Sequence, residues 1–261
     1  MTERKLKNNL EGLYKKYNKE SFVHPDPLEF LYSYKDIRDR EIIGLIASSL
    51  AYGRVAQILK SISTVTDIIG PSPSRFVESN TNKSLCKAFK GFKHRFADSN
   101  HLSALLSGAN KAIENYGSLN GCFKAGLSPD DETILPAMHF FVQQLCNGNN
   151  DPGHLLALPE KGSACKRMNL FLRWMVRKDE VDPGGWDGVS PSMLLIPLDT
   201  HMHRISIGLG LTKRKQANMK TVLEITSGFR KFSPDDPVKF DFTLTRFGIR
   251  DDMDIKDVIH V

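Results

Sequence analysis

The amino-acid sequence predicts an all-α protein. Residues 40–51 and 55–69 carry apolar side chains at helical spacing, and Gly70-Pro71 ends the second run cleanly. No segment shows the sustained alternation of apolar and polar residues that is typical of a half-buried strand. Apolar residues make up 40% and charged residues 25% of the 261 residues, an ordinary globular composition.

Further helices are expected along the rest of the chain. The pattern places them at 102–116, 133–146, 163–177, 200–209 and 221–232. Asp236-Pro237 resembles an N-cap followed by a first-turn proline, so it predicts the start of a last helix that stops at Gly248. The turn-rich segment 147–153 is the predicted boundary between two helical lobes around a cleft, within a single domain spanning 1–261.

Charge and hydropathy restrict the class of partner. The formal net charge of +6 favours an anionic partner. No run of 18 apolar residues is present, and the first 16 residues are charged rather than apolar. We therefore expect a cytoplasmic protein that has no membrane partner.

The cysteines and histidines do not predict a metal. Cys86, Cys122, Cys146 and Cys165 match no zinc or iron–sulfur spacing, so reduced, packed thiols are expected. His201 and His203 are two positions apart, which a helix does not place on one face. We expect neither a metal nor a cofactor.

The segment 163–177 has an unusual composition for a helix. Arg173, Trp174 and Arg177 share the helix face of Lys166. Such a stripe suits a surface that contacts phosphates and a planar base. The alternative is a solvated charged edge around a partly buried Trp174.

The segment Leu198-Asp-Thr-His-Met-His-Arg-Ile-Ser-Ile-Gly-Leu-Gly-Leu211 resembles a segment of the helix-hairpin-helix DNA glycosylases. In that superfamily the aspartate lies at a helix N-terminus and faces the flipped nucleotide, and Asp199 is the matching residue. The resemblance covers about residues 40–250 and implies a helix-hairpin-helix DNA glycosylase-like fold. The hairpin itself departs from the pattern, because Leu158-Pro-Glu-Lys-Gly162 lacks the first glycine.

Lys166 precedes Asp199 by 33 positions (199 − 166), which is similar to the spacing in the divergent archaeal 8-oxoguanine DNA glycosylases. Over the whole chain, the sequence looks like a bacterial family described as domain of unknown function 2400. Three motifs carry that resemblance: Phe92-Lys-His-Arg-Phe96, Leu172-Arg-Trp-Met-Val-Arg177 and Pro197-Leu-Asp-Thr-His201. That family implies no activity.

The superfamily resemblance implies that Lys166 and Asp199 are the catalytic pair. Breaking an N-glycosidic bond develops positive charge on the sugar, which a carboxylate stabilises, while a neutral amine can attack the anomeric carbon and form a Schiff base. A partly desolvated lysine is therefore expected. The simpler alternatives are a solvent-facing lysine in a first helical turn and an aspartate that only caps a helix.

A flipped base needs a pocket with a stacking surface. Tyr52, Phe171 and Trp174 are the candidates for stacking, and the backbone amides of 160–163 are candidates for a phosphate contact. Further substrate or DNA contacts are expected at Arg54, His94, Arg95 and His201, the alternative for His94 and Arg95 being a surface loop. Ser49, His94 or Asp241 could supply the polar group that distinguishes a damaged base.

The sequence thus predicts a monomeric base-excision repair enzyme associated with the nucleoid. Its expected activity is that of a DNA glycosylase with lyase activity, removing an oxidised purine similar to 8-oxoguanine from damaged duplex DNA. Two alternatives remain: a non-catalytic helical module that binds nucleic acid, and an enzyme that processes RNA or nucleotides.

Overall fold

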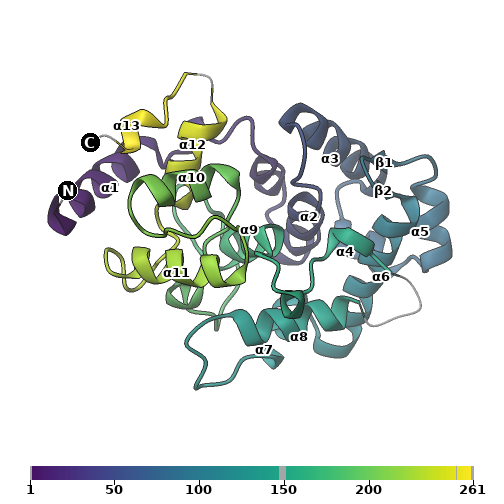
Figure 1. The fold of residues 1–261 in the computed structure, drawn as a ribbon. Helices are drawn as coiled ribbons and strands as arrows, with labels where there is room; N and C mark the ends of the chain where they lie inside the picture. Colours follow the sequence, from purple (N-terminus) through teal and green to yellow (C-terminus); the bar gives the residue numbers. More distant parts are fainter. Residues whose placement is uncertain (1, 147–150, 251, 260–261) are drawn as a thin grey trace.

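The computed structural model describes residues 2–146, 151–250 and 252–259, which are predominantly helical (Figure 1). The all-α prediction is confirmed. The α-helices of these ranges are α1 (Glu3–Tyr17), α2 (Ile37–Ser49), α3 (Val55–Ile69), α4 (Pro73–Glu78), α5 (Asn82–Ala88), α6 (Ser99–Tyr116), α7 (Leu119–Ala125), α8 (Leu135–Leu145), α9 (Lys166–Val176), α10 (Thr200–Gly208), α11 (Met219–Arg230), α12 (Asp241–Ile249) and α13 (Lys256–Ile259). The strands β1 (Lys93–His94) and β2 (Ala97–Asp98) form one short antiparallel hairpin.

Local signals fix most helix ends. The predicted helix 55–69 coincides with α3, which ends at Gly70 in a conformation with φ 77°. The Asp36 carboxylate begins α2 by accepting a hydrogen bond from the Arg38 amide at 2.8 Å. Asp98 begins α6 in the same way, and its own backbone N–H donates a reciprocal hydrogen bond to His101 Nδ1.

The predicted N-cap at Asp236-Pro237 is wrong. The last long helix, α12, begins at Asp241 instead, after a turn that buries Val238 and Phe240. The Asp236 carboxylate accepts a hydrogen bond from Arg177 Nε at 2.9 Å. Because the Asp236 oxygens face the Arg177 guanidinium, they do not cap a helix that follows.

Helix α2 lies in the middle of the fold (Figure 1). Residues Ile42, Ile43, Leu45 and Ile46 are fully buried, and the helix packs against α4 and α9. Helix α6 packs against α5, α7 and α8, whereas α12 packs against α1 and α10. One continuous apolar core joins these groups, so the described residues pack as a single unit.

The predicted lobe boundary at 147–153 falls largely outside the described residues, since 147–150 are not among them. Helix α8, which precedes this segment, packs against α6, and helix α9, which follows it, packs against α2. Helix α4 contacts both α2 and α6 and so connects the two pairs. The boundary stays a prediction. No helix of the described ranges has the length and apolarity needed to cross a bilayer.

Candidate functional site

A pocket of about 620 Å³ opens between the first turns of α9, the connection between α2 and α3, and helix α12. Its apolar wall comes from Val55, Ile58, Leu170 and Leu198. Its polar wall includes Lys166 and Asp199, which the sequence predicted as a reacting pair. The lining of the pocket therefore combines aliphatic side chains with charged ones.

The structure brings Lys166 and Asp199 together. Lys166 Nζ lies 3.4 Å from Asp199 Oδ2, and the two side chains are 34% and 15% exposed. Asp199 is also the N-cap of α10, because its Oδ1 accepts a hydrogen bond from the Met202 amide at 2.8 Å. One carboxylate thus uses one oxygen to hold a helix and the other to face the amine.

Arg167 fixes the first turn of α9, on which Lys166 lies. Its guanidinium donates to the Ser49 carbonyl at 2.9 Å and to the His154 carbonyl, and lies 5.0 Å from the centre of the Tyr52 ring. Burial lowers the pKa of Arg167. These contacts join α9 to the end of α2 and so hold Lys166 at a defined place on the pocket wall.

Tyr52 lines the pocket and belongs to a fixed hydrogen-bond chain. Its hydroxyl donates to the His94 carbonyl at 2.8 Å, so the 2.8 Å contact with His154 Nε2 requires that nitrogen to carry the proton. His94 is fully buried: its Nε2 donates to the Tyr52 carbonyl at 3.1 Å, and its Nδ1 accepts from Ser61 Oγ at 2.8 Å. Burial lowers the pKa of His94, consistent with a neutral ring.

His94 therefore supports Tyr52 and does not bind phosphate, which corrects the sequence prediction. Both ring nitrogens are already used and no side-chain surface is exposed. Arg54 and Arg95 are exposed on the same side of the molecule, near Gly53 at the pocket. His201 is half-buried in the pocket wall, against Gly248.

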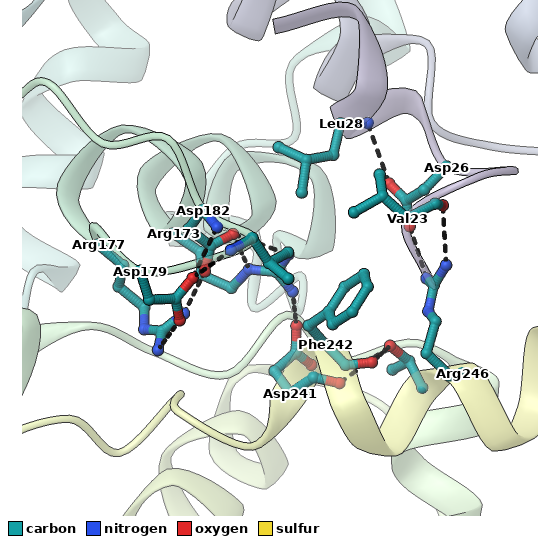
Figure 2. A network of polar contacts seen from close by, with 12 residues as sticks. Val23, Asp26, Leu28, Arg173, Arg177, Asp179, Asp182, Asp241, Phe242 and Arg246 are labelled. Atoms are coloured by element: carbon teal, nitrogen blue, oxygen red, sulfur yellow. Dashed lines mark hydrogen bonds and ion pairs between the residues drawn. The ribbon is translucent and has the colours of Figure 1, made fainter. Parts of the chain in front are cut away.

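The stripe predicted to touch DNA is buried, so that prediction is wrong. Trp174 and Phe171 are fully buried in the core, and the Arg173 and Arg177 side chains are only 3% and 4% exposed. Figure 2 shows the two arginines surrounded by carboxylates. Of the predicted stacking residues, only Tyr52 lines the pocket.

These two arginines and four aspartates form a network that we call the buried charge network: Arg173, Arg177, Asp179, Asp182, Asp236 and Asp241. Arg173 Nη2 lies 3.1 Å from Asp182 Oδ1, and its Nη1 contacts Asp241. Arg177 contacts Asp179 Oδ2 at 2.8 Å, and also Asp182. Because every guanidinium has several carboxylate partners, the network holds the C-terminal half of α9 to its neighbours.

Asp241 links this network to the pocket. It lines the pocket and is fully buried, and burial raises its pKa to about 6, although Arg173 acts in the opposite direction and Asp199 adds to the rise. Its Oδ1 has no hydrogen-bond partner among the residues that the structure describes. Of the three polar groups proposed to distinguish a damaged base, Ser49, His94 and Asp241, only Asp241 lines this pocket.

A second buried pair completes the pocket wall and was not foreseen from the sequence. Arg246 is 1% exposed and contacts Asp26 Oδ2 at 2.6 Å, and both residues line the pocket. Asp26-Pro27 carries the signal of a helix start, and Asp26 does accept from the Leu28 amide. Nothing in the local pattern indicates that its other oxygen meets an arginine 220 positions away.

The proposed phosphate-binding amides at 160–163 are partly used within their own turn. Lys161 N donates to the Leu158 carbonyl at 3.2 Å, and Gly162 N donates to the Pro159 carbonyl at 2.9 Å. This turn contains a short 3-10 helix, Pro159–Lys161. Two of the predicted donors are therefore not free for a ligand.

Within the described ranges no cluster of three or more histidine, cysteine or acidic side chains has the arrangement of a metal site. The molecule is thus a helical protein with a polar-walled pocket beside a buried charge network. The chain belongs to the family described as protein of unknown function (DUF2400), whose model matches residues 26–250. No curated protein and no solved structure matches it.

Proposed function

We propose that this protein is a DNA glycosylase with lyase activity, which removes an oxidised purine from damaged DNA through a Schiff base on Lys166. The observation that carries the proposal is the 3.4 Å approach of Lys166 Nζ and Asp199 Oδ2 in the wall of the pocket. A lysine and a carboxylate facing one cavity are the two groups that this reaction requires.

The shape and charge of the pocket support the proposal. Its volume of about 620 Å³ is in the range of small-molecule sites, and a base and part of its sugar can enter a site of that size. The aliphatic side chains Val55, Ile58 and Leu170 in the lining offer apolar surface to a planar base. The net charge of +6 favours a polyanion as the larger ligand.

In the proposed reaction, neutral Lys166 Nζ attacks the anomeric carbon of the flipped nucleotide. The new C–N bond forms as the glycosidic bond breaks, and the base leaves with that electron pair and takes up a proton. The attacking nitrogen gives up one of its two protons to Asp199, which offsets the proton that the base takes up. The sugar ring then opens as the nitrogen lone pair forms the C=N bond, and the second nitrogen proton passes to the ring oxygen. Asp199 Oδ2 lies where it stabilises the positive charge of the sugar and accepts the amine proton.

Borohydride trapping on abasic DNA tests the nucleophile. Wild-type protein should give a covalent protein–DNA adduct, and Lys166→Gln should give none while it still binds DNA. Lys161→Gln is the matched control, since Lys161 is an exposed lysine in the short 3-10 helix that precedes α9. Equal trapping by Lys166→Gln and wild type would contradict the assignment.

The damaged base is tested on oligonucleotides that carry 8-oxoguanine, uracil, an alkylated purine or an abasic site. We expect release of 8-oxoguanine, because a pocket with a polar group such as Asp241 can bond the N–H that distinguishes it from guanine. Release of uracil or the alkylated base alone would refute that substrate and leave the glycosylase class intact.

A non-catalytic nucleic-acid-binding module is the second candidate. It is favoured by the capping bond from Asp199 to the Met202 amide, since a capping aspartate beside a lysine can be purely structural. DNA binding without trapping or base release on any of the four substrates would select this candidate.

A further inference from the structure

The turn of the β1–β2 hairpin presents an exposed aromatic ring. His94 pairs with Ala97, which leaves Arg95 and Phe96 as the two turn residues. Phe96 is 73% exposed, more than Ile37, Ile68 and Ile207, the other exposed large hydrophobic residues of the described ranges. A single exposed hydrophobic residue is common on protein surfaces, so the significance of this ring depends on its position and its neighbours.

The hairpin holds this ring in place. The two residues that flank the turn, His94 and Ala97, are buried, and Asp98 at the end of β2 caps α6. Arg95 adopts φ 53°, a conformation for which a hairpin turn normally selects glycine at this position. A non-glycine residue kept in that conformation at an exposed tip is a feature of functional sites.

The tip lies beside the pocket. Gly53 lines the pocket, and a side-chain carbon built on it would be 2.9 Å from Cδ of Arg95, so the Arg95 side chain crosses over this glycine. The Arg95 guanidinium also lies 5.5 Å from the centre of the Phe96 ring. Lys93, in strand β1, and Arg54, next to Gly53, are exposed as well, so this part of the surface carries further positive charge.

We propose that Phe96 stacks on a nucleobase of DNA held at the mouth of the pocket, while Arg95 contacts a neighbouring phosphate. Exposed bases stack on aromatic side chains with little dependence on sequence, and arginines beside the ring supply the charge that a phosphate backbone requires. This inference rests on the proposed function for the identity of the ligand, but not on any chemistry by Lys166.

The first test is a fluorescence measurement with Phe96→Trp. Trp174 and Trp186 are both buried, so the introduced indole would be exposed to solvent where these two are not. Stacking should quench its emission on addition of DNA that contains an abasic site. Ile68→Trp is the control, because Ile68 is partly exposed near the far end of α3, 13 residues (68 − 55) or about 20 Å along the helix from pocket residue Val55.

The second test measures affinity. Phe96→Ala should weaken binding of the same labelled DNA about tenfold by fluorescence anisotropy, whereas Phe96→Tyr should restore it, because a tyrosine keeps the ring. Arg95→Ala should lower the slope of log Kd against log salt by about one. Circular dichroism verifies that each variant is folded.

The outcomes separate this inference from the proposed function. Unquenched Phe96→Trp together with unchanged affinity of Phe96→Ala would overturn the stacking role, even if Lys166 traps DNA. Quenching and weakened binding without any trapping would uphold the stacking role and refute the glycosylase. A quench of the Ile68→Trp control equal to that of Phe96→Trp would also overturn it.

Discussion

One helix, α9, carries two cation–carboxylate groups that differ in almost every physical respect. At its C-terminal end, Arg173 and the C-cap residue Arg177 are nearly inaccessible, and each meets two or more aspartates. At its first residue, Lys166 is 34% exposed and meets one carboxylate at 3.4 Å. The difference separates charges enclosed within the fold from a charge that a ligand in the pocket can reach.

Burial accounts for this division. A buried ion is tolerated only where partners replace its water, and the aspartates that contact Arg173 and Arg177 meet this requirement. Lys166 lines the pocket and, within the part of the chain that the structure describes, forms an ion pair with one carboxylate, that of Asp199. Accessibility and the number of partners, rather than charge itself, distinguish the two groups.

The largest expected effect on stability comes from breaking the buried charge network. Arg173→Met leaves Asp241 and Asp182 buried with fewer cationic partners, and should lower the free energy of unfolding by about 3–5 kcal/mol. Urea titration measures it. Arg214→Met, which removes an exposed pair with Glu224, is the matched control and should leave the unfolding midpoint unchanged.

The second prediction concerns pH and Asp241. Its pKa rises from an ordinary 3.8 to about 6 on folding, so the folded state binds the proton more tightly. This carboxyl therefore contributes stability that is complete below pH 3.8 and is lost as pH rises through 6, by roughly 2–3 kcal/mol. The unfolding free energy of wild type minus that of Asp241→Asn should fall over this interval; a flat difference would contradict the assignment.

The third prediction concerns the capping role of Asp199. Asp199→Asn should keep much of the bond to the Met202 amide, because asparagine also caps, whereas Asp199→Ala should destabilise the protein by about 1 kcal/mol. Both variants should lose base release about equally. Full activity in a destabilised Asp199→Ala would show that the residue is only a cap.

The smallest expected effect is on the stability of the Lys166 variant. Lys166→Gln breaks one half-exposed pair, so the free energy of unfolding should change by less than about 1 kcal/mol. Thermal unfolding beside wild type measures the change. A loss comparable to that of Arg173→Met would place Lys166 with the structural charges and end the contrast between the two groups.

The sequence predicted where the helices lie better than which of their faces are buried. Helix α3 was predicted at its observed bounds because its apolar periodicity and terminal glycine act locally. The same periodicity placed Arg173, Trp174 and Lys166 on one face, but it could not show that α12 and the turn at 179–182 cover one end of that face and leave the other open. Burial of a stripe depends on contacts that are distant in sequence.

In the candidate site, too, contacts between residues distant in sequence could not be predicted. The Lys166–Asp199 pair was predicted through a resemblance of motifs, and the structure does bring the two side chains together. Phe96 was noticed only as part of a motif, because a hairpin with two residues in each strand leaves no periodic signal. Arg246 and Asp26 went unrecognised, since pairing across 220 positions has no local signature.

The division of α9 into two halves has a consequence for directed evolution. Leu170, Val55 and Ile58 line the pocket without belonging to the buried charge network, so a saturation library at these positions can vary the shape of the cavity. Positions 173 and 177 should be left unchanged in such a library, because most substitutions there would remove folded protein before any change in substrate range could be selected. A library that varies the pocket while keeping the protein folded therefore combines the first two turns of α9 with Val55 and Ile58 of α3, and stops before Arg173.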